Sequence, residues 1–134
     1  MKRNIGIATV VLLGAVVAAV VLSGCGGSAC LTCEVVDISA AQLQAMIDDG
    51  LPLVLADVRT PAEFATGHIP GAVNLPLDDI DTWANTLNPT TRTCCICQSG
   101  VRSATAANIL VVMGFTQVYN LLGGMNEWPG PTEP

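Results

Sequence analysis

Cys97 stands where the sequence passes from a short strand-forming run into a loop and then a helix. Residues 93–96 are rich in cysteine and β-formers, and the apolar spacing of residues 104–113 predicts a helix that stops at Gly114. Backbone N–H groups and the positive end of a helix dipole converge on such a loop. That field favours a thiolate, and it lowers a thiol pKa of about 8.5 by roughly one to several units. Cys97 is therefore a candidate nucleophile.

The residues after Cys97 are typical of an active-site loop. Gly100 permits a turn with positive φ and leaves the sulfur uncrowded, and Arg102 adds a positive charge beside it. The run Cys97-Gln-Ser-Gly-Val-Arg102-Ser103 resembles the active-site loop of rhodanese-like sulfurtransferases.

Two further stretches resemble the same family. Residues 57–64 and 67–74 are similar to its second strand and the following segment, and residues 122–128 are similar to its closing helix. Three signatures in the family's order, over about residues 34–130, are far more specific than a lone C-x4-R motif. The resemblance implies an α/β three-layer sandwich around a mainly parallel five-stranded sheet.

The resemblance also implies a sulfur-transfer chemistry that needs no metal and no organic cofactor. Cys97 is the expected catalytic residue. Its thiolate attacks the outer sulfur of a small sulfane-sulfur donor, holds that sulfur as a persulfide, and passes it to a thiol or to cyanide. Backbone N–H groups of the loop are expected to stabilise the terminal sulfur, as an oxyanion hole does. The expected substrate-binding residues are Gln98, Ser99, Gly100, Val101, Arg102 and Ser103.

The loop is poor in positive charge. Rhodaneses that favour thiosulfate resemble one another in carrying basic residues there, whereas Gln98, Ser99 and Val101 are uncharged. We therefore expect weak turnover of thiosulfate, with a polysulfide, a low-molecular-weight persulfide or a protein partner as the donor. The sequence does not choose among these.

Two other functions share parts of this pattern. Dual-specificity phosphatases resemble the family in fold and, like arsenate reductases, suggest oxyanion chemistry. Their C-x5-R loop is one residue longer than the run from Cys97 to Arg102, and a tetrahedral oxyanion needs that wider cradle. The second alternative is a lipid-anchored interaction module or sulfur carrier that acts with a protein partner. A carrier would have the same intact loop.

The flanking sequence predicts strands that alternate with helices. Residues 34–38 predict a first strand, Ser39 predicts the N-cap of a helix, and residues 53–56 predict a strand buried on both faces. This alternation indicates an α/β sandwich, in which ligands bind beyond the carboxyl ends of the strands. Asp57 and Cys97 both fall at that edge.

Three further elements are predicted. Glu63 completes a capping box with Thr60, which indicates a structural role for this carboxylate. The core spacing within residues 78–87 predicts a helix, and the β-formers within residues 117–122 predict the last strand. Both tryptophans of the chain are expected to pack in the core rather than to bind a cofactor.

Asp57, Arg59 and His68 each have a catalytic and a structural interpretation. Asp57 and Arg59 have the types of an acid/base pair, but the family resemblance favours a bracing role beside the loop. His68 is the only histidine and has the type of a base for Cys97. We favour a loop histidine held by hydrogen bonds, because the helix dipole already accounts for a thiolate. A single histidine also argues against a histidine-rich metal site.

The first 24 residues have the pattern of a secretory signal. Two basic residues precede the 18-residue apolar run 5–22, and Leu22-Ser-Gly-Cys25 resembles the lipobox of bacterial lipoproteins. In such proteins the signal is cleaved before the cysteine, which is then acylated. The alternative is a permanent transmembrane anchor, because 18 residues just suffice to span a bilayer. Either way we expect the domain in the periplasm or on the outer surface of a bacterium.

Composition and charge divide the chain further. We expect a signal over residues 1–24, a flexible tether over 25–33, one domain over 34–130 and a frayed tail over 131–134. Cleavage before Cys25 leaves 110 residues with three arginines, no lysine and eleven acidic residues, a net charge of −8. That charge argues against nucleic acid as a partner and leaves membrane attachment to the lipid.

Four more cysteines raise the question of a disulfide or a metal site. Cys30 and Cys33 have C-x2-C spacing, but the adjacent Cys94 and Cys95 match no common zinc pattern, and export favours disulfides. We expect Cys97 to stay free, because it lies about 10 Å along an extended strand from Cys94. Cys30 or Cys33 is expected to pair with the other or to reach Cys94. The alternative is four unpaired thiols.

Overall fold

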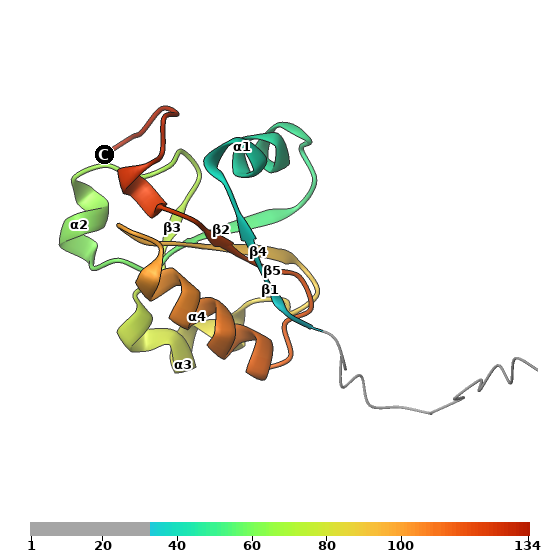
Figure 1. Ribbon diagram of the computed structural model, residues 1–134. Helices are drawn as coiled ribbons and strands as arrows, with labels where there is room; N and C mark the ends of the chain where they lie inside the picture. The colour runs from blue at the N-terminus through green and yellow to red at the C-terminus, as the bar shows by residue number, and fades with distance from the viewer. Residues whose placement is uncertain (1–32) are drawn as a thin grey trace, which may run out of the picture.

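The computed structural model describes residues 33–134 of the 134-residue chain. Figure 1 shows a central sheet with helix α1 (Ala40–Asp48) on one side and helices α3 (Ile80–Trp83) and α4 (Val101–Val112) on the other. The predicted three-layer α/β sandwich is therefore confirmed.

The predictions for the N-terminal region lie outside the described residues. They concern the signal 1–24, the acylated Cys25, Cys30 and all but the last residue of the tether. Within residues 33–134, no helix has the length and apolar character needed to cross a membrane.

The sheet has five strands, and every pairing is parallel. Its order is β1-β5-β4-β2-β3, which places β4 in the centre between β5 and β2. The strands are β1 (Val35–Ile38), β2 (Leu53–Asp57), β3 (Val73–Asn74), β4 (Arg92–Ile96) and β5 (Val118–Leu121). Since all five run the same way, Asp57 and Cys97 emerge at one edge, as predicted.

Alternate residues of β4 point to opposite faces of the sheet. Cys95 packs on the α4 face with Leu110, whereas Cys94 and Ile96 pack on the α1 face with Leu43. A parallel strand covered by helices on both faces needs such an apolar run. Each fully buried leucine contributes roughly 1.5–3 kcal/mol relative to an exposed one.

Capping boxes begin two of the helices. Ser39 accepts a hydrogen bond from the Gln42 backbone at the start of α1, and the Gln42 side chain accepts one from the Ser39 backbone. Thr60 and Glu63 make the same reciprocal pair at the start of helix α2 (Pro61–Ala65). Both predicted caps are confirmed.

The predicted helix over residues 78–87 is broken into three short pieces. They are the 3₁₀ helix η1 (Leu77–Asp79), α3, and the 3₁₀ helix η2 (Ala84–Thr86). Side chains at its C-terminal end bond to helix carbonyls: the Asn85 amide donates to Asp81 and the Thr86 hydroxyl to Trp83.

The core positions of this segment are nevertheless as expected. Ile80, Trp83 and Ala84 are buried, and the Trp83 indole donates to the Pro76 carbonyl. Trp128 packs against the cluster on the α1 face. Both tryptophans therefore serve the core.

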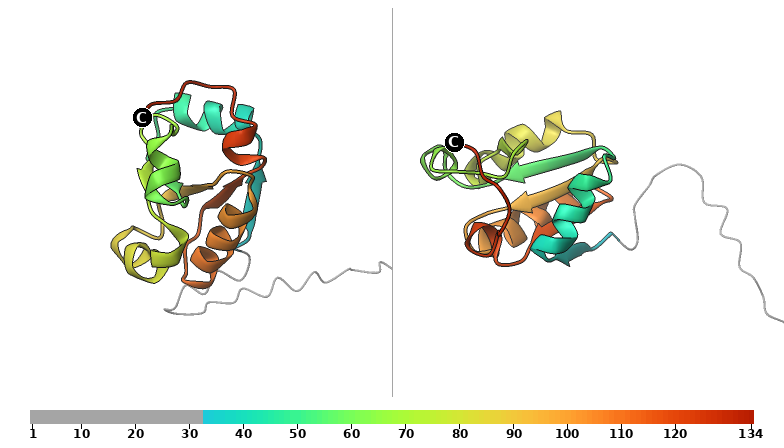
Figure 2. Two further views of the ribbon diagram at one scale, coloured as in Figure 1. Left: turned by 90° about the vertical axis from the view of Figure 1, so that its left-hand side faces the viewer. Right: turned by 90° about the horizontal axis from the view of Figure 1, so that it is seen from above.

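The C-terminal end differs from the sequence-based expectations in two ways. The predicted closing helix is a single 3₁₀ turn, η3 (Gly124–Asn126), because Pro129 disfavours a helical conformation at Trp128. Residues 131–134 do not fray: Glu133 forms an antiparallel bridge with His68, with two backbone hydrogen bonds of 2.9 Å. Figure 2 shows the C-terminus beside α2.

The bonding states of the described cysteines test part of the disulfide prediction. Cys94, Cys95 and Cys97 are free, so the predicted pairing through Cys94 is wrong and the predicted free Cys97 is confirmed. Cys94 lies fully buried in the central strand, where no thiol from the start of β1 reaches it. Cys33 is disulfide-bonded, so four unpaired thiols are also excluded.

Candidate active site

Cys97 follows the central strand β4 directly and lies three residues before the N-cap of α4. Gly100 is that N-cap, with φ of 93°, a left-handed conformation that favours glycine. A Cβ there would lie 3.2 Å from the Leu121 carbonyl oxygen and 3.2 Å from the Gly123 nitrogen. The tight turn between strand and helix thus depends on this glycine.

Helix α4 begins at Val101, three residues earlier than predicted. Arg102 and Ser103 therefore belong to its first turn rather than to the loop. The apolar periodicity that predicted the helix starts only at Ala104, because the first turn carries the polar residues of the site.

The Cys97 sulfur is enclosed by hydrogen-bonding groups. The Gly100 backbone N–H donates to Sγ at 3.1 Å, and the Ser103 Oγ lies 3.3 Å from Sγ, where either atom can donate. Burial raises the pKa of the Cys97 thiol, since the residue has no exposed surface. Backbone hydrogen bonds from Ser103, Ser99 and Gly100 lower that pKa, and the net pKa lies below the ordinary value.

A buried ion pair holds the loop from the side of β2. The Arg59 guanidinium bonds to Asp57 through Nε at 2.9 Å and Nη2 at 2.7 Å, and both side chains are almost fully buried. Its Nη1 donates to the Gln98 Oε1 at 3.2 Å, and its Nη2 donates to the Gly67 carbonyl. This arrangement agrees with the bracing role expected for both residues, because their bonds go to structural partners and to the loop.

The loop is also held by η3. The carbonyls of Cys97 and Gln98 accept hydrogen bonds from the Met125 and Asn126 backbones at 2.9 and 3.0 Å. The Gln98 amide donates to the Asn126 side chain at 2.6 Å. A Cβ at Gly124 would overlap the Cys97 carbonyl oxygen. Gln98 is thus fixed on both sides, by Arg59 and by Asn126.

The charge of Arg102 is balanced by Glu63. Its Nη1 and Nη2 donate to the two carboxylate oxygens of Glu63 at 2.9 and 2.7 Å. This bidentate bond and the backbone of Thr60 lower the pKa of Glu63 to about 2. The predicted capping residue therefore also joins α2 to α4 beside the loop.

His68 lies against α2 and the C-terminal segment. Its ring stacks on Phe64 with centroids 3.6 Å apart, its Nδ1 lies 3.1 Å from the Phe64 carbonyl oxygen, and its Nε2 lies 3.6 Å from the Glu133 carboxylate. These contacts agree with the interpretation as a loop histidine held by hydrogen bonds. Cys97 receives its hydrogen bonds from other groups.

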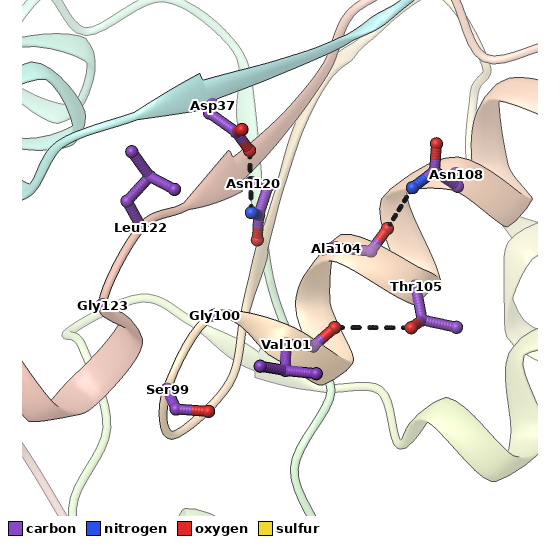
Figure 3. Close-up of a pocket in the computed structure, with 10 residues that line it drawn as sticks. All are labelled: Asp37, Ser99, Gly100, Val101, Ala104, Thr105, Asn108, Asn120, Leu122 and Gly123. Carbon is purple, nitrogen blue, oxygen red and sulfur yellow. Dashed lines mark hydrogen bonds between the residues drawn. The ribbon is translucent and has the colours of Figure 1, made fainter.

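A pocket of about 550 Å³ adjoins the outer side of the loop, and Figure 3 shows its walls. Of the predicted substrate-binding residues, Ser99, Gly100 and Val101 line it, together with residues of β1, β5 and α4. Cys97 is not a lining residue. The described part of the chain holds no group of three or more His, Cys, Asp or Glu side chains that could bind a metal ion.

Sequence reasoning missed Asn120 and Asp37. Asn120 is buried in β5 and bonds to both Ser103 and Asp37. The available signal is a polar residue within an otherwise β-forming run.

Comparisons with known proteins relate the chain to one family of domains. The family model of the rhodanese-like domain matches residues 39–130. YrkF of Bacillus subtilis, named as a candidate sulfur carrier protein, is 38% identical over 97 residues, which cover 72% of this chain and 52% of YrkF. The thiosulfate sulfurtransferase GlpE of Pseudomonas entomophila is 34% identical over 99 residues, which cover 71% of this chain and 89% of GlpE.

A solved structure shares the fold. The crystal structure of a rhodanese-like domain protein from Staphylococcus aureus superposes with a TM-score of 0.68 at 32% identity, covering 73% of this chain and 96% of that one. The chain spans only about half of YrkF, so a common domain rather than a common whole protein relates these two.

Proposed function

Because the chain belongs to the rhodanese-like domain family, we propose that it is a sulfurtransferase that carries sulfur on Cys97. The observation that carries this proposal is the environment of Sγ. A thiol at a strand end accepts a hydrogen bond from the Gly100 N–H, and its pKa lies below the ordinary value. A lowered pKa increases the fraction of the thiolate, which is the nucleophilic form of cysteine.

The reaction needs only sulfur–sulfur exchange. The Cys97 thiolate forms a bond to the outer sulfur of the donor, the donor's own bond to that sulfur breaks, and the electron pair leaves with the remainder of the donor. The terminal sulfur of the resulting persulfide carries the charge, which the backbone N–H groups of the loop stabilise. A thiolate or cyanide then takes the outer sulfur, and Cys97 leaves as the thiolate.

The charges around the loop favour a donor other than the thiosulfate dianion. The described residues contain three arginines, and each is bound to a carboxylate: Arg59 to Asp57, Arg92 to Asp49, and Arg102 to Glu63. No unpaired guanidinium in this part of the chain attracts a dianion to Gln98 or Ser99. We propose a polysulfide, a small persulfide or a protein persulfide as the donor.

A sulfur carrier that acts with a protein partner is a second candidate. The complete burial of Cys97 favours it, because a partner that opens the loop would then control access to the sulfur. The name of YrkF points the same way. The two candidates share the persulfide and differ in whether small acceptors discharge it without help.

The purified protein tests the persulfide directly. After incubation with a polysulfide, intact mass should increase by one sulfur atom, and a reducing thiol should reverse the gain. Cys97→Ser should show no such gain, whereas Cys95→Ser should retain it. A sulfur gain that survives in Cys97→Ser would refute the assignment. Repeating the loading with thiosulfate tests the choice of donor.

We further propose export and lipid attachment at Cys25, which support a role outside the cytoplasm. The lipobox-like sequence and the net charge of −8 after cleavage both favour acylation as the means of attachment. Cys25→Ala should block processing or release the domain from membranes. Fractionation with metabolic acyl labelling measures both. A variant that is processed normally and stays membrane-bound would contradict lipid attachment at this residue.

A further inference from the structure

A chain of three hydrogen bonds runs from Cys97 to a solvent-exposed carboxylate. Ser103 Oγ lies 3.3 Å from Cys97 Sγ and donates to Asn120 Oδ1 at 2.6 Å, and Asn120 Nδ2 donates to Asp37 Oδ1 at 2.8 Å. Ser103 and Asn120 are buried, whereas Asp37 is exposed at the wall of the pocket beside the loop. Figure 3 shows the bond between Asp37 and Asn120.

Strand register explains why these side chains meet. Asp37 of β1 stands opposite Asn120 of β5, and Asn120 stands opposite Cys95 of β4. Residues opposite one another in a parallel sheet point to the same face, which here is the face that α4 covers. The first turn of α4 then brings Ser103 onto Asn120, so a polar side chain occupies a position that apolar packing would otherwise fill.

Donor and acceptor capacities fix the direction of every proton in this chain. A carboxylate only accepts, so the amide nitrogen of Asn120 faces Asp37 and the amide oxygen faces Ser103. An amide oxygen also only accepts, so the single hydroxyl proton of Ser103 is used in the bond to Asn120. Ser103 therefore presents a lone pair to Cys97, which suits a thiol S–H and not a thiolate.

We propose that Asp37 is a positioning residue for the sulfur-transfer loop: through Asn120 it directs the Ser103 hydroxyl away from Cys97, so that Ser103 accepts from the thiol instead of donating to the thiolate. The proposal rests on the proposed function for the role of Cys97, but its geometry does not. To donate to the thiolate, Ser103 must leave the buried Asn120 oxygen without its donor, which is unfavourable.

The consequence for the reaction is a bias among the states of Cys97. In the thiol and in the persulfide, Sγ carries no charge and the bond from Ser103 to Asn120 persists. In the thiolate, Sγ carries the charge and only the backbone N–H groups donate to it without competition. Asp37 thus favours the loaded and the resting forms over the free thiolate that lies between them.

Three ionisable groups near Cys97 keep one charge state while it titrates. Arg102 remains charged, because the bond to Glu63 raises its pKa, and Glu63 has a pKa of about 2. Burial raises the pKa of Cys95 to about 12, so that thiol stays neutral. A change in the titration of Cys97 on mutation of Asp37 therefore reports on this chain of hydrogen bonds or on the lost charge itself.

The direction in which Ser103→Ala shifts the titration of Cys97 tests the proposal. The readout is the pH midpoint for alkylation of Cys97 by iodoacetamide, followed on its peptide by mass spectrometry. If Ser103 accepts from the thiol, its removal destabilises the thiol, and the midpoint should fall by about half to one pH unit. A midpoint that rises would show that Ser103 donates to the thiolate in the native protein, and it would overturn the proposal.

Asp37→Asn tests the exposed end of the hydrogen-bond chain without disturbing the core. An amide at this position can donate or accept, so Asn120 is free to turn and release the Ser103 hydroxyl toward Cys97. The midpoint should again fall by about half to one pH unit. Asp48→Asn removes an equal charge from the end of α1, where Asp48 bonds to Gln44, and serves as the matched control.

The double variant separates the hydrogen bonds from charge alone. In the Ser103→Ala background, Asp37→Asn should shift the midpoint no further than Asp48→Asn does, since no hydroxyl remains to be redirected. If Asp37→Asn shifts the midpoint equally in the native and the Ser103→Ala backgrounds, Asp37 acts only through its charge and the proposal is refuted. Alkylation needs no sulfur transfer, so the failure of the proposed function leaves this result unaffected, and the reverse also holds.

Discussion

Cys95 and Cys97 lie two residues apart on the same face of the same strand and its extension, yet they have opposite properties. Both side chains are completely buried. Burial raises the pKa of Cys95 to about 12, whereas the pKa of Cys97 lies below the ordinary value. The difference comes from the backbone around each sulfur rather than from exposure.

The end of the sheet makes this difference. At Cys95 the neighbouring strands β2 and β5 use the backbone in ladder hydrogen bonds, and the side chain lies in the apolar cluster beneath α4. At Cys97 the ladder has ended, so the Gly100 N–H is available for the sulfur. A buried thiol without hydrogen-bond donors around its sulfur is inert, whereas a buried thiol with such donors is reactive.

The largest expected effect is the loss of activity on removing one thiol and not the other. Cys97→Ser should lower sulfur transfer by at least about a thousandfold, because it removes the nucleophile with little change in shape. Cys95→Ser should retain activity, with some loss of stability. The transfer of sulfur from polysulfide to cyanide, measured as thiocyanate, gives both values. Equal losses in the two variants would break the comparison.

The next effect concerns the Gly100 N–H, the hydrogen-bond donor that distinguishes the surroundings of Cys97 from those of Cys95. Gly100→Ala introduces strain at a φ of 93° and crowds the Leu121 carbonyl, so the Gly100 N–H should move off the sulfur. We expect roughly 1–3 kcal/mol of destabilisation and a tenfold or greater loss of activity.

Gly114→Ala is its control, because Gly114 has a φ of 96° with open space around it. Gly114→Ala should lose only the roughly 1–2 kcal/mol of stability that the backbone strain costs, and its activity should be unchanged. Urea denaturation and the transfer assay measure the two quantities. Parallel behaviour of these variants would mean that the Gly100 turn matters for folding and not for the thiol.

The smallest effect is on the pH dependence of stability. Above the ordinary thiol value of 9.0, unfolded Cys95 loses a proton that the native state retains up to about pH 12. Cys95 should therefore lower the free energy of unfolding by at most about 1.4 kcal/mol per pH unit in that window, and Cys95→Ala should lose this part of the slope. Burial also raises the pKa of Cys94, so the contribution of Cys94 should remain in that variant.

Cys97 should act in the opposite direction and in a different window. Its native pKa is lowered, so it contributes stability that is present above 9.0 and is lost as pH falls toward the native pKa. Comparing Cys97→Ala with the native chain below pH 9.0 measures this. A slope of the same sign for both thiols would contradict the opposite shifts.

The sequence was sufficient to predict the fold, the position of Cys97 between a strand and a helix, the N-cap at Ser39 and the capping box of Thr60 and Glu63. Each depends on local spacing that the motifs contain. It did not predict the start of α4, since polar residues in the first turn interrupt the apolar pattern. It did not predict the pairing of Arg102 with Glu63, which lie 39 residues apart, nor the Ser103–Asn120–Asp37 chain, which depends on strand register.

The C-terminal residues 131–134 show the same limit of prediction from sequence. The composition of residues 131–134 gives no sign of a partner, because Pro- and Gly-rich ends usually fray. Only the folded path of residues 61–71 creates a backbone edge at His68 to which Glu133 can bond. Contacts between distant segments of this kind follow from topology and leave no local pattern.

The parallel direction of all five strands has a consequence for how an anchored protein would face its surroundings. Val35 opens β1 at the amino-terminal pole of the sheet, and Cys97 lies just past the carboxyl end of β4, at the other pole. The ten residues from Cys25 to Glu34 span at most about 35 Å when extended. The lipid proposed at Cys25 would therefore attach the domain at the pole opposite the sulfur-bearing loop.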